Sequence, residues 1–276
     1  MTRVAVVTIA HGRHEHWALQ RAALERSRRR PDERILVVMD DPVLAREARA
    51  AGGTRVVETD LDAGSLPLAR ARNLGAREAL ARGADVLVLL DVDCLPAPGL
   101  VDAYADAASA AATREHLLSG PVTYLDPAPA GGYDLDGLAS LDRPHPARPA
   151  PPPGDVVIGG SHDLFWSLSF ALTADLWRRI GGFHEGYVGY GGEDTDFAWT
   201  ARSLDVPMAW VGSARAFHQH HPIEDPPRRH LDAILRNGAL FHDRWGSWPM
   251  RGWLDAFVDE GLVERTASGG YRRSGA

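Results

Sequence analysis

The chain has 276 residues, of which 45% are hydrophobic, enough for one large α/β domain or two small domains with a sizeable core. A formal net charge of -7 argues against nucleic acid as the main partner, because phosphate binding needs a clustered basic surface. The single cysteine, Cys94, excludes an intramolecular disulfide and a four-cysteine zinc site, and the absence of lysine excludes Schiff-base and P-loop lysine chemistry.

The apolar run at the start of the sequence ends after a few residues in a polar, histidine-containing turn, which is too short for a signal peptide or a membrane span. We therefore expect a cytoplasmic protein with no integral membrane segment. Short β-rich runs then alternate with amphipathic helical patterns. Strands are expected at 4–9, 35–39, 55–58 and 86–90, and helices at 17–29, 42–51 and 68–81. This alternation predicts an α/β, Rossmann-like nucleotide-binding fold, with a mostly parallel central sheet flanked by helices.

Ligands of such sheets bind at the carboxyl ends of the strands, so the residues after each strand are the first candidates for a site. Thr8, His11 and Arg13 accompany the end of the first strand, and Asp40 follows the second. An arginine in a polar turn can bind phosphate, and an aspartate can accept from a base or ribose hydroxyl. Ordinary turn formation explains these residues equally well.

Two aspartates, Asp91 and Asp93, end the most apolar predicted strand. Residues i and i+2 of an extended chain point to the same side, so both carboxylates can face one bound ion. Mg²⁺ and Mn²⁺ prefer oxygen ligands and keep coordination positions open for substrate phosphates. An exposed strand-end turn is the alternative, because Asp-x-Asp is a common tripeptide. The position after a buried strand favours a metal site.

Proline, alanine, glycine and aspartate dominate the segment 126–160, where no helical or strand period persists. A loop of this length is usually a lid, a binding loop or a connector, and we expect it to be poorly ordered until a ligand binds. Regular patterns return at 168–172, 174–180, 195–203 and 207–211, and the tail from 227 onward is expected to be helical. These patterns predict one domain at 1–222, with halves at 1–125 and 161–222, and a helical tail at 223–276.

The most unusual stretch is 181–197, in which a run of glycines and aromatic residues leads into three acids. Glycines such as Gly192 permit positive φ and a close approach of the backbone to a ligand. Acids at a helix N-terminus also serve as caps that complement the helix dipole. Capping, with Asp194 or Thr195 as the cap, explains one or two of the three acids but not the glycine-aromatic run. We therefore expect one carboxylate to act as a general base toward a hydroxyl group.

Three histidines, His218, His220 and His221, follow the last predicted strand. A neutral imidazole can complete the coordination of a metal ion already held by a carboxylate. Exposed loop histidines are the alternative, and the sequence does not distinguish which of the three would be the ligand. Three histidines within four consecutive residues favour a metal-ligand role for at least one of them.

These motifs together resemble those of glycosyltransferases with the GT-A fold, and the second half of the chain resembles the β-1,4-galactosyltransferase family. The segment 180–196 matches that family's Gly-Phe and aromatic-Gly-aromatic-Gly-Gly-Glu-Asp pattern nearly position for position. The Asp-Val-Asp at 91–93 is similar to the family's metal motif, and the Arg-His-Glu-His-Trp at 13–17 to its Arg-x-Glu-His-Leu. The stretch 68–75 is similar to bacterial family-2 transferases and polypeptide GalNAc-transferases.

The resemblance implies roles for individual residues. Asp194 falls on the catalytic base, and Glu193 on the acid that contacts the acceptor. Tyr190 falls on an aromatic residue that contacts both donor and acceptor, where the family has Trp. Asp93 is the firmer metal ligand, assisted by Asp91.

The same resemblance extends to residues around the donor nucleotide. His218 aligns with a histidine that closes the metal site in the polypeptide GalNAc-transferases. Arg13 and Arg70 fall on nucleotide contacts. Trp166 and Tyr190 offer flat faces of the kind on which sugars stack, so we count both as acceptor contacts.

The expected function is therefore transfer of a sugar, a hexose or an N-acetylhexosamine, from a UDP-sugar to a hydroxyl acceptor with inversion of configuration. Mn²⁺ or Mg²⁺ would bind the diphosphate, and a guanosine nucleotide is the alternative donor. A sugar-nucleotide pyrophosphorylase is a second interpretation, but it usually needs a glycine-rich loop after the first strand and a catalytic lysine, which this chain lacks. A non-catalytic sugar-binding protein on a degenerate GT-A fold is a third.

Overall fold

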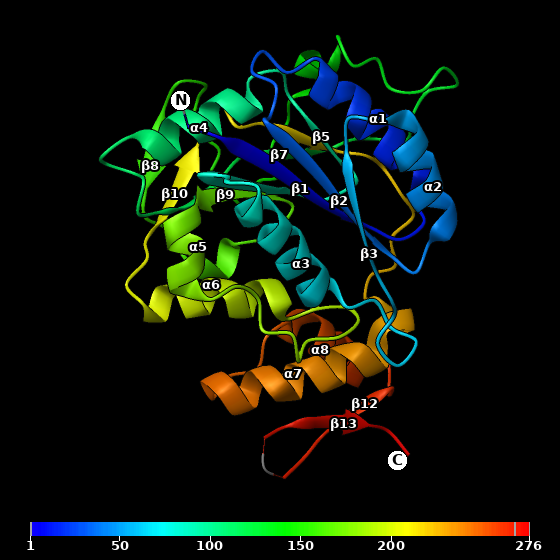
Figure 1. Ribbon diagram of the computed structural model, residues 1–276. Helices are drawn as coiled ribbons and strands as arrows, with labels where there is room; N and C mark the ends of the chain where they lie inside the picture. The colour runs from blue at the N-terminus through cyan, green and yellow to red at the C-terminus, as the bar shows by residue number, and fades with distance from the viewer. Residues whose placement is uncertain (1, 268, 276) are drawn as a thin grey trace.

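The computed structural model describes residues 2–267 and 269–275, and Figure 1 shows a central sheet covered by helices on both faces. The first four strands are hydrogen-bonded in the order β3-β2-β1-β4, and every pair among them is parallel. Their bounds are β1 Val4–Ala10, β2 Glu33–Met39, β3 Arg55–Thr59 and β4 Val86–Leu90. The connecting helices are α1 His14–Glu25, α2 Pro42–Ala51 and α3 Leu68–Ala81. All seven predicted elements of this half are confirmed, although α1 begins and ends earlier than expected.

The sheet continues through four further strands to the full order β3-β2-β1-β4-β9-β6-β10-β8. These are β6 Leu117–Ser119, β8 Val156–Ile158, β9 Ser169–Thr173 and β10 Met208–Val211. Strand β9 is antiparallel to both of its neighbours, β4 and β6, and β8 is antiparallel to β10 at the edge. The remaining strands share one direction, so the prediction of a mostly parallel α/β sheet is confirmed.

A second sheet of three short strands lies beside the first, in the order β5-β11-β7. Its strands are β5 Cys94–Pro96, β7 Val122–Tyr124 and β11 Ala216–His218. The pairing of β11 with β5 is antiparallel and places His218 opposite Cys94. This register brings the segment after β4 next to the histidine-rich segment, although more than a hundred residues separate them in the chain.

Alternating apolar side chains of the strands form a core on each face of the main sheet. In β1, Val7 belongs to the core on the side of α3, α5 and α6, whereas Val6 belongs to the core on the side of α1 and α4. Helix α3 lies so close to the sheet that a Cβ on Gly75 would come within 2.3 Å of Val7. The remaining helices of the body are α4 Leu100–Ser109, α5 Ala174–Ile180 and α6 Glu193–Ser203.

The segment 126–160 is mostly irregular, as expected, but it contains a 3₁₀ turn at Leu138–Leu141 and the edge strand β8. The tail contains α7 Leu231–Trp245 and α8 Arg251–Asp259, and below them in Figure 1 a hairpin of β12 Val263–Arg265 and β13 Tyr271–Arg273. The hairpin corrects the expectation that the tail is wholly helical. Short 3₁₀ turns also occur at His162–Leu164 and Arg228–His230. None of the helices in the described part of the chain is long and apolar enough to cross a membrane.

Candidate active site

The turn after β4 carries the two predicted aspartates and is held by Gln20 of α1. The Gln20 side-chain amide donates to the backbone carbonyls of Asp91 at 2.6 Å and Cys94 at 2.9 Å. Its own carbonyl oxygen accepts from the Thr8 hydroxyl at 3.0 Å. These bonds fix the direction in which the chain leaves the sheet. Thr8 is therefore buried behind the turn, where its hydroxyl supports the site from beneath.

Asp93 lies next to two of the three candidate histidines. One possible ligand atom from each of Asp93, His218 and His221 lies within 4.8 Å of the others. His218 Nε2 is 3.5 Å from Asp93 Oδ1, and His221 Nε2 is 3.6 Å from Asp93 Oδ2. Asp93 Oδ1 is buried and has no hydrogen-bond partner among the described residues. A buried orphan carboxylate oxygen facing two imidazoles is a donor set that fits a divalent cation.

The protonation states of this group also suit a cation. Burial opposes charge on Asp93, but contacts with His221, His218 and Arg13 outweigh it and lower the pKa of this carboxyl. Burial lowers the pKa of His218, which favours the neutral imidazole that a metal ion requires. His220 is exposed and lies outside the group, so His218 and His221 are the candidates that the fold places together.

A buried arginine, Arg72, connects the two halves of the site. Its guanidinium is 3.1 Å from Asp91 Oδ1 and 3.2 Å from Glu193 Oε1, and its side chain is 6% exposed. Asp91 thus faces Arg72 rather than the Asp93 and histidine group, and the prediction that it binds metal has no further support from this arrangement. Arg72 links the end of β4 to the first residue of α6.

The carboxylates around Arg72 have raised pKa values. Burial raises the pKa of Asp91 to about 6, despite the opposing effect of Arg72. Burial together with the neighbouring Asp194 raises the pKa of Glu193 to about 7. Burial also raises the pKa of Asp194, although the Thr195 backbone N–H, which donates to Asp194 Oδ1 at 2.7 Å, opposes this. Raised pKa values on clustered acids are typical of sites that transfer protons.

The glycine-rich loop before α6 takes its shape from conformations that favour glycine and from contacts with the tail. Gly192, the residue before α6, has φ 91°, and a Cβ there would lie 3.1 Å from the Tyr187 ring. The buried Asn237 of α7 donates to the backbone carbonyls of Val188, Tyr190 and Gly191. The role of Asn237 could not be predicted, because nothing in the sequence links a helical asparagine to a loop more than forty residues earlier.

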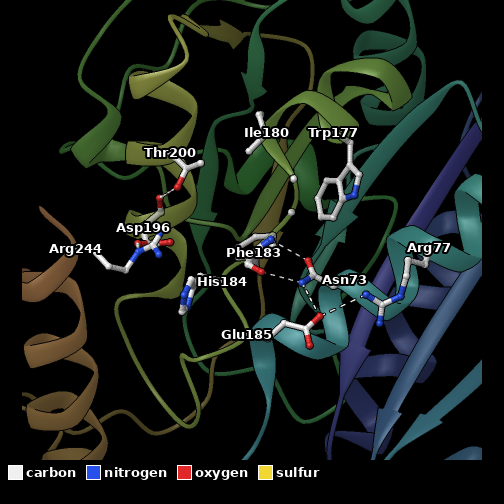
Figure 2. Close-up of a pocket in the computed structure, with 12 residues that line it drawn as sticks. Asn73, Arg77, Trp177, Ile180, Phe183, His184, Glu185, Asp196, Thr200 and Arg244 are labelled. Carbon is white, nitrogen blue, oxygen red and sulfur yellow. Dashed lines mark hydrogen bonds and ion pairs between the residues drawn. The ribbon is translucent and has the colours of Figure 1, made fainter.

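The same loop is anchored from its other side, beside a pocket of about 540 Å³. Figure 2 shows the residues that line this pocket. There Asn73 of α3 donates to the Phe183 carbonyl and accepts from the Phe183 N–H, both at 2.8 Å. Asp196 of α6 accepts from Arg244 of α7. The pocket contains neither Asp93 nor Asp194, so we assign it to the support of the loop and not to the reaction.

The other sequence-predicted residues differ in how close they lie to this group. Arg13 is near enough to Asp93 and His218 to affect the pKa of each. His11 Nδ1 is 2.7 Å from the Met39 carbonyl, and Asp40 is exposed with φ 46°. Arg70 is directed to the loop after β3, where it donates to the Asp60 carbonyl at 2.7 Å.

The two predicted aromatic contacts already have aromatic partners. Tyr190, 38% exposed, stacks on His230 with ring centroids 4.6 Å apart and lies 5.7 Å from the Trp253 ring. Trp166 is half-buried and contacts His145 edge to face. Each still has an accessible part that a sugar ring could cover.

The chain has the GT-A glycosyltransferase fold, with the sheet order described above. The Asp93, His218 and His221 group lies beside the sheet, and α6 begins with acidic residues. The predicted resemblance is confirmed. A family model described as the N-terminal domain of galactosyltransferase matches residues 161–221, the part of the chain that contains the glycine-rich loop and His218.

Two curated proteins of similar sequence are named as glucosyltransferases. Over 82 residues the chain is 33% identical to validoxylamine A glucosyltransferases of Streptomyces hygroscopicus subsp. jinggangensis (strain 5008) and subsp. limoneus. The alignments cover 29% of this chain and 18% and 17% of those proteins, so the chain spans less than a fifth of these curated relatives.

Solved structures show the same fold at low sequence identity. GalNAc-T7 crystallised with UDP, GalNAc and Mn²⁺ superposes with a TM-score of 0.54 at 16% identity, over 80% of this chain and 44% of that one. A fragment of TarS from S. aureus gives 0.54 at 11% identity, over 86% of this chain and 65% of that one. The chain therefore shares its fold with these solved structures.

Proposed function

We propose that the protein transfers a sugar from a UDP-sugar to a hydroxyl acceptor, with inversion at the anomeric carbon and with a divalent cation on the donor diphosphate. The observation that carries the proposal is that two groups lie near the end of β4, where Asp91 is within electrostatic reach of both Asp93 and Asp194. One is the Asp93, His218 and His221 group, and the other is the acid pair at the start of α6. Arg72 links the second group to the end of β4.

Asp93, His218 and His221 would hold the cation, which when bound supplies charge neutralisation for the departing diphosphate. The UDP, GalNAc and Mn²⁺ named for the GalNAc-T7 structure support this assignment of donor and cation. Arg13 lies near enough to Asp93 to affect its pKa, and it would bind a phosphate oxygen by a charge-assisted hydrogen bond.

Asp194 is the proposed general base. Its carboxylate takes the proton of the acceptor hydroxyl while that oxygen forms a bond to the anomeric carbon. The bond from this carbon to the diphosphate oxygen breaks on the opposite side, and the electron pair leaves with UDP. The raised pKa of Asp194, caused by burial, favours its acceptance of the proton. Glu193 is held by Arg72 and would orient the acceptor hydroxyl.

Isothermal calorimetry with UDP, GDP and dTDP, in Mn²⁺ and in chelator, tests the donor and cation assignment. We expect UDP to bind in Mn²⁺ and to lose at least about tenfold in affinity in chelator or after Asp93→Asn, because the carboxylate and cation act together. Asp85→Asn, which changes an acid at the opposite end of β4, is the matched control and should bind normally. Equal UDP affinity with and without Mn²⁺ would contradict the proposal.

A further inference from the structure

The irregular segment before β8 contains a buried arginine, Arg148, with no protein partner for its charge. Arg148 is 5% exposed. None of its guanidinium nitrogens has a hydrogen-bond partner within the described ranges 2–267 and 269–275, and no carboxylate there pairs with it. The guanidinium is instead placed between two indole rings, 5.3 Å from the Trp166 centroid and 5.2 Å from that of Trp210.

Such an arrangement is energetically unusual for a protein interior. Arginine is almost never fully buried without a paired charge, because its guanidinium keeps five N–H donors that lose their hydration. Cation–π contacts with two tryptophans offset only part of that loss. Burial accordingly lowers the pKa of Arg148. An anion that is not part of the chain would supply the missing hydrogen bonds.

The position of Arg148 connects it to the candidate active site. A row of ring contacts leads from Trp166 to His145, from His145 to Tyr124, and from Tyr124 to His218 of the metal-ligand group. Asp194 lies near enough to favour the charged form of Arg148. The guanidinium is therefore connected through Trp166 and these rings to the metal-ligand group, and it lies within electrostatic reach of the proposed base.

We propose that Arg148 binds an anionic group of the donor, either a phosphate or a carboxylate on the sugar. This proposal rests on the proposed function. Trp210 is fully buried and donates to the Gly159 carbonyl at 3.0 Å, so its ring is fixed. Trp166 is half-buried and contacts His145 edge to face, so the Trp166 ring would have to move for the donor to reach the guanidinium. Planar guanidinium donors match both anions in two-point geometry.

The test is calorimetric titration of the full chain in Mn²⁺ with UDP, UDP-glucose and UDP-glucuronic acid. Arg148→Met keeps most of the side-chain volume and removes the charge. We expect it to lower the affinity for at least one probe by about tenfold or more. An equal loss for all three probes identifies the diphosphate as the anion, whereas a loss confined to UDP-glucuronic acid identifies a sugar carboxylate. The melting temperature without nucleotide should stay unchanged or rise, because a buried unpaired charge is removed.

Two further variants test whether Arg148 binds an anion or has only a structural role. Arg202→Met removes another arginine that stacks on an indole, 3.9 Å from the Trp199 centroid, and should bind all three probes normally. Arg148→Lys keeps the charge without the planar fork, and decides the matter if the Met variant does not fold. Wild-type affinity of either Arg148 variant for all three probes overturns the proposal. A wild-type protein that binds none of them in Mn²⁺ would instead overturn the proposed function, and this proposal with it.

Discussion

Replacement of Arg72 by Met should destabilise the protein strongly, and more so at high pH than at low pH. Met fills a similar volume but leaves Asp91 and Glu193 without the guanidinium that lies 3.1 and 3.2 Å from them. Removal of one partner from a buried ion pair costs about 3–5 kcal/mol. The Asp91 side chain is 24% exposed, so we expect the lower end, about 3 kcal/mol at pH 8, from a total that is typically about 5–15 kcal/mol.

The sign of the pH effect follows from the raised pKa values of the two acids, about 6 for Asp91 and about 7 for Glu193. A pKa raised by folding means that the folded state holds more protons than the unfolded state between the two pKa values. The free energy of unfolding therefore falls as the pH rises from the pKa of the unfolded state to that of the folded state. Loss of Arg72 removes an influence that lowers both values, so they rise further in the variant. At pH 5.5 both carboxyl groups would then be largely neutral and the missing cation would matter less.

Urea unfolding of the wild type and Arg72→Met at pH 8 and pH 5.5 measures the difference. Arg70→Met is the matched control on the same helix, because Arg70 is half-buried and its ion pair with Asp62 is 3.8 Å long. The control should cost less than about 1 kcal/mol at either pH. A loss below about 1 kcal/mol for Arg72→Met at pH 8, or an equal loss at both pH values, would refute the reasoning.

Three other predictions concern the base, the tail and the irregular segment. Asp194→Asn should abolish transfer and leave UDP affinity nearly unchanged; turnover within about tenfold of wild type, or about 1.4 kcal/mol of barrier, would exclude Asp194 as the base. Asp196→Asn should lower the free energy of unfolding by about 3 kcal/mol, because the buried carboxylate accepts from Arg244 and Trp245 at 2.7 Å each; a loss below about 1 kcal/mol in urea unfolding would contradict this. Hydrogen exchange in 126–160 should slow when UDP and Mn²⁺ are added, and unchanged exchange would make the segment a spacer.

The regular elements of the first half could be predicted because each has a clear period and an apolar face. Arg72 of the third of these helices is a residue that the same periodicity also bears on. Buried residues of α3 include Ala69, Arg72, Asn73 and Ala76, a spacing of three and four that places Arg72 on the inward face and Arg70 off it. The period could have identified Arg72. Its partners could not be identified, because Glu193 is 121 residues away in the chain.

Other features gave no local signal at all. Strands β5, β8 and β11 have three residues each, too few to establish an alternation. They form because distant segments pair with them, and β8 lies in a segment whose prolines predicted only a loop. The buried position of Arg148 likewise depends on Trp166 and Trp210, and no sequence period places these three side chains together.

The contact of Asn237 with the glycine-rich loop has a consequence for the order in which a newly made chain reaches its final structure. Glycines at 186, 189, 191 and 192 leave the loop backbone many conformations, and Asn237 binds three of its carbonyls. Translation produces the sheet and the acids of α6 before it produces α7, which carries Asn237. The loop therefore cannot take its final conformation until α7 has been synthesised and has docked.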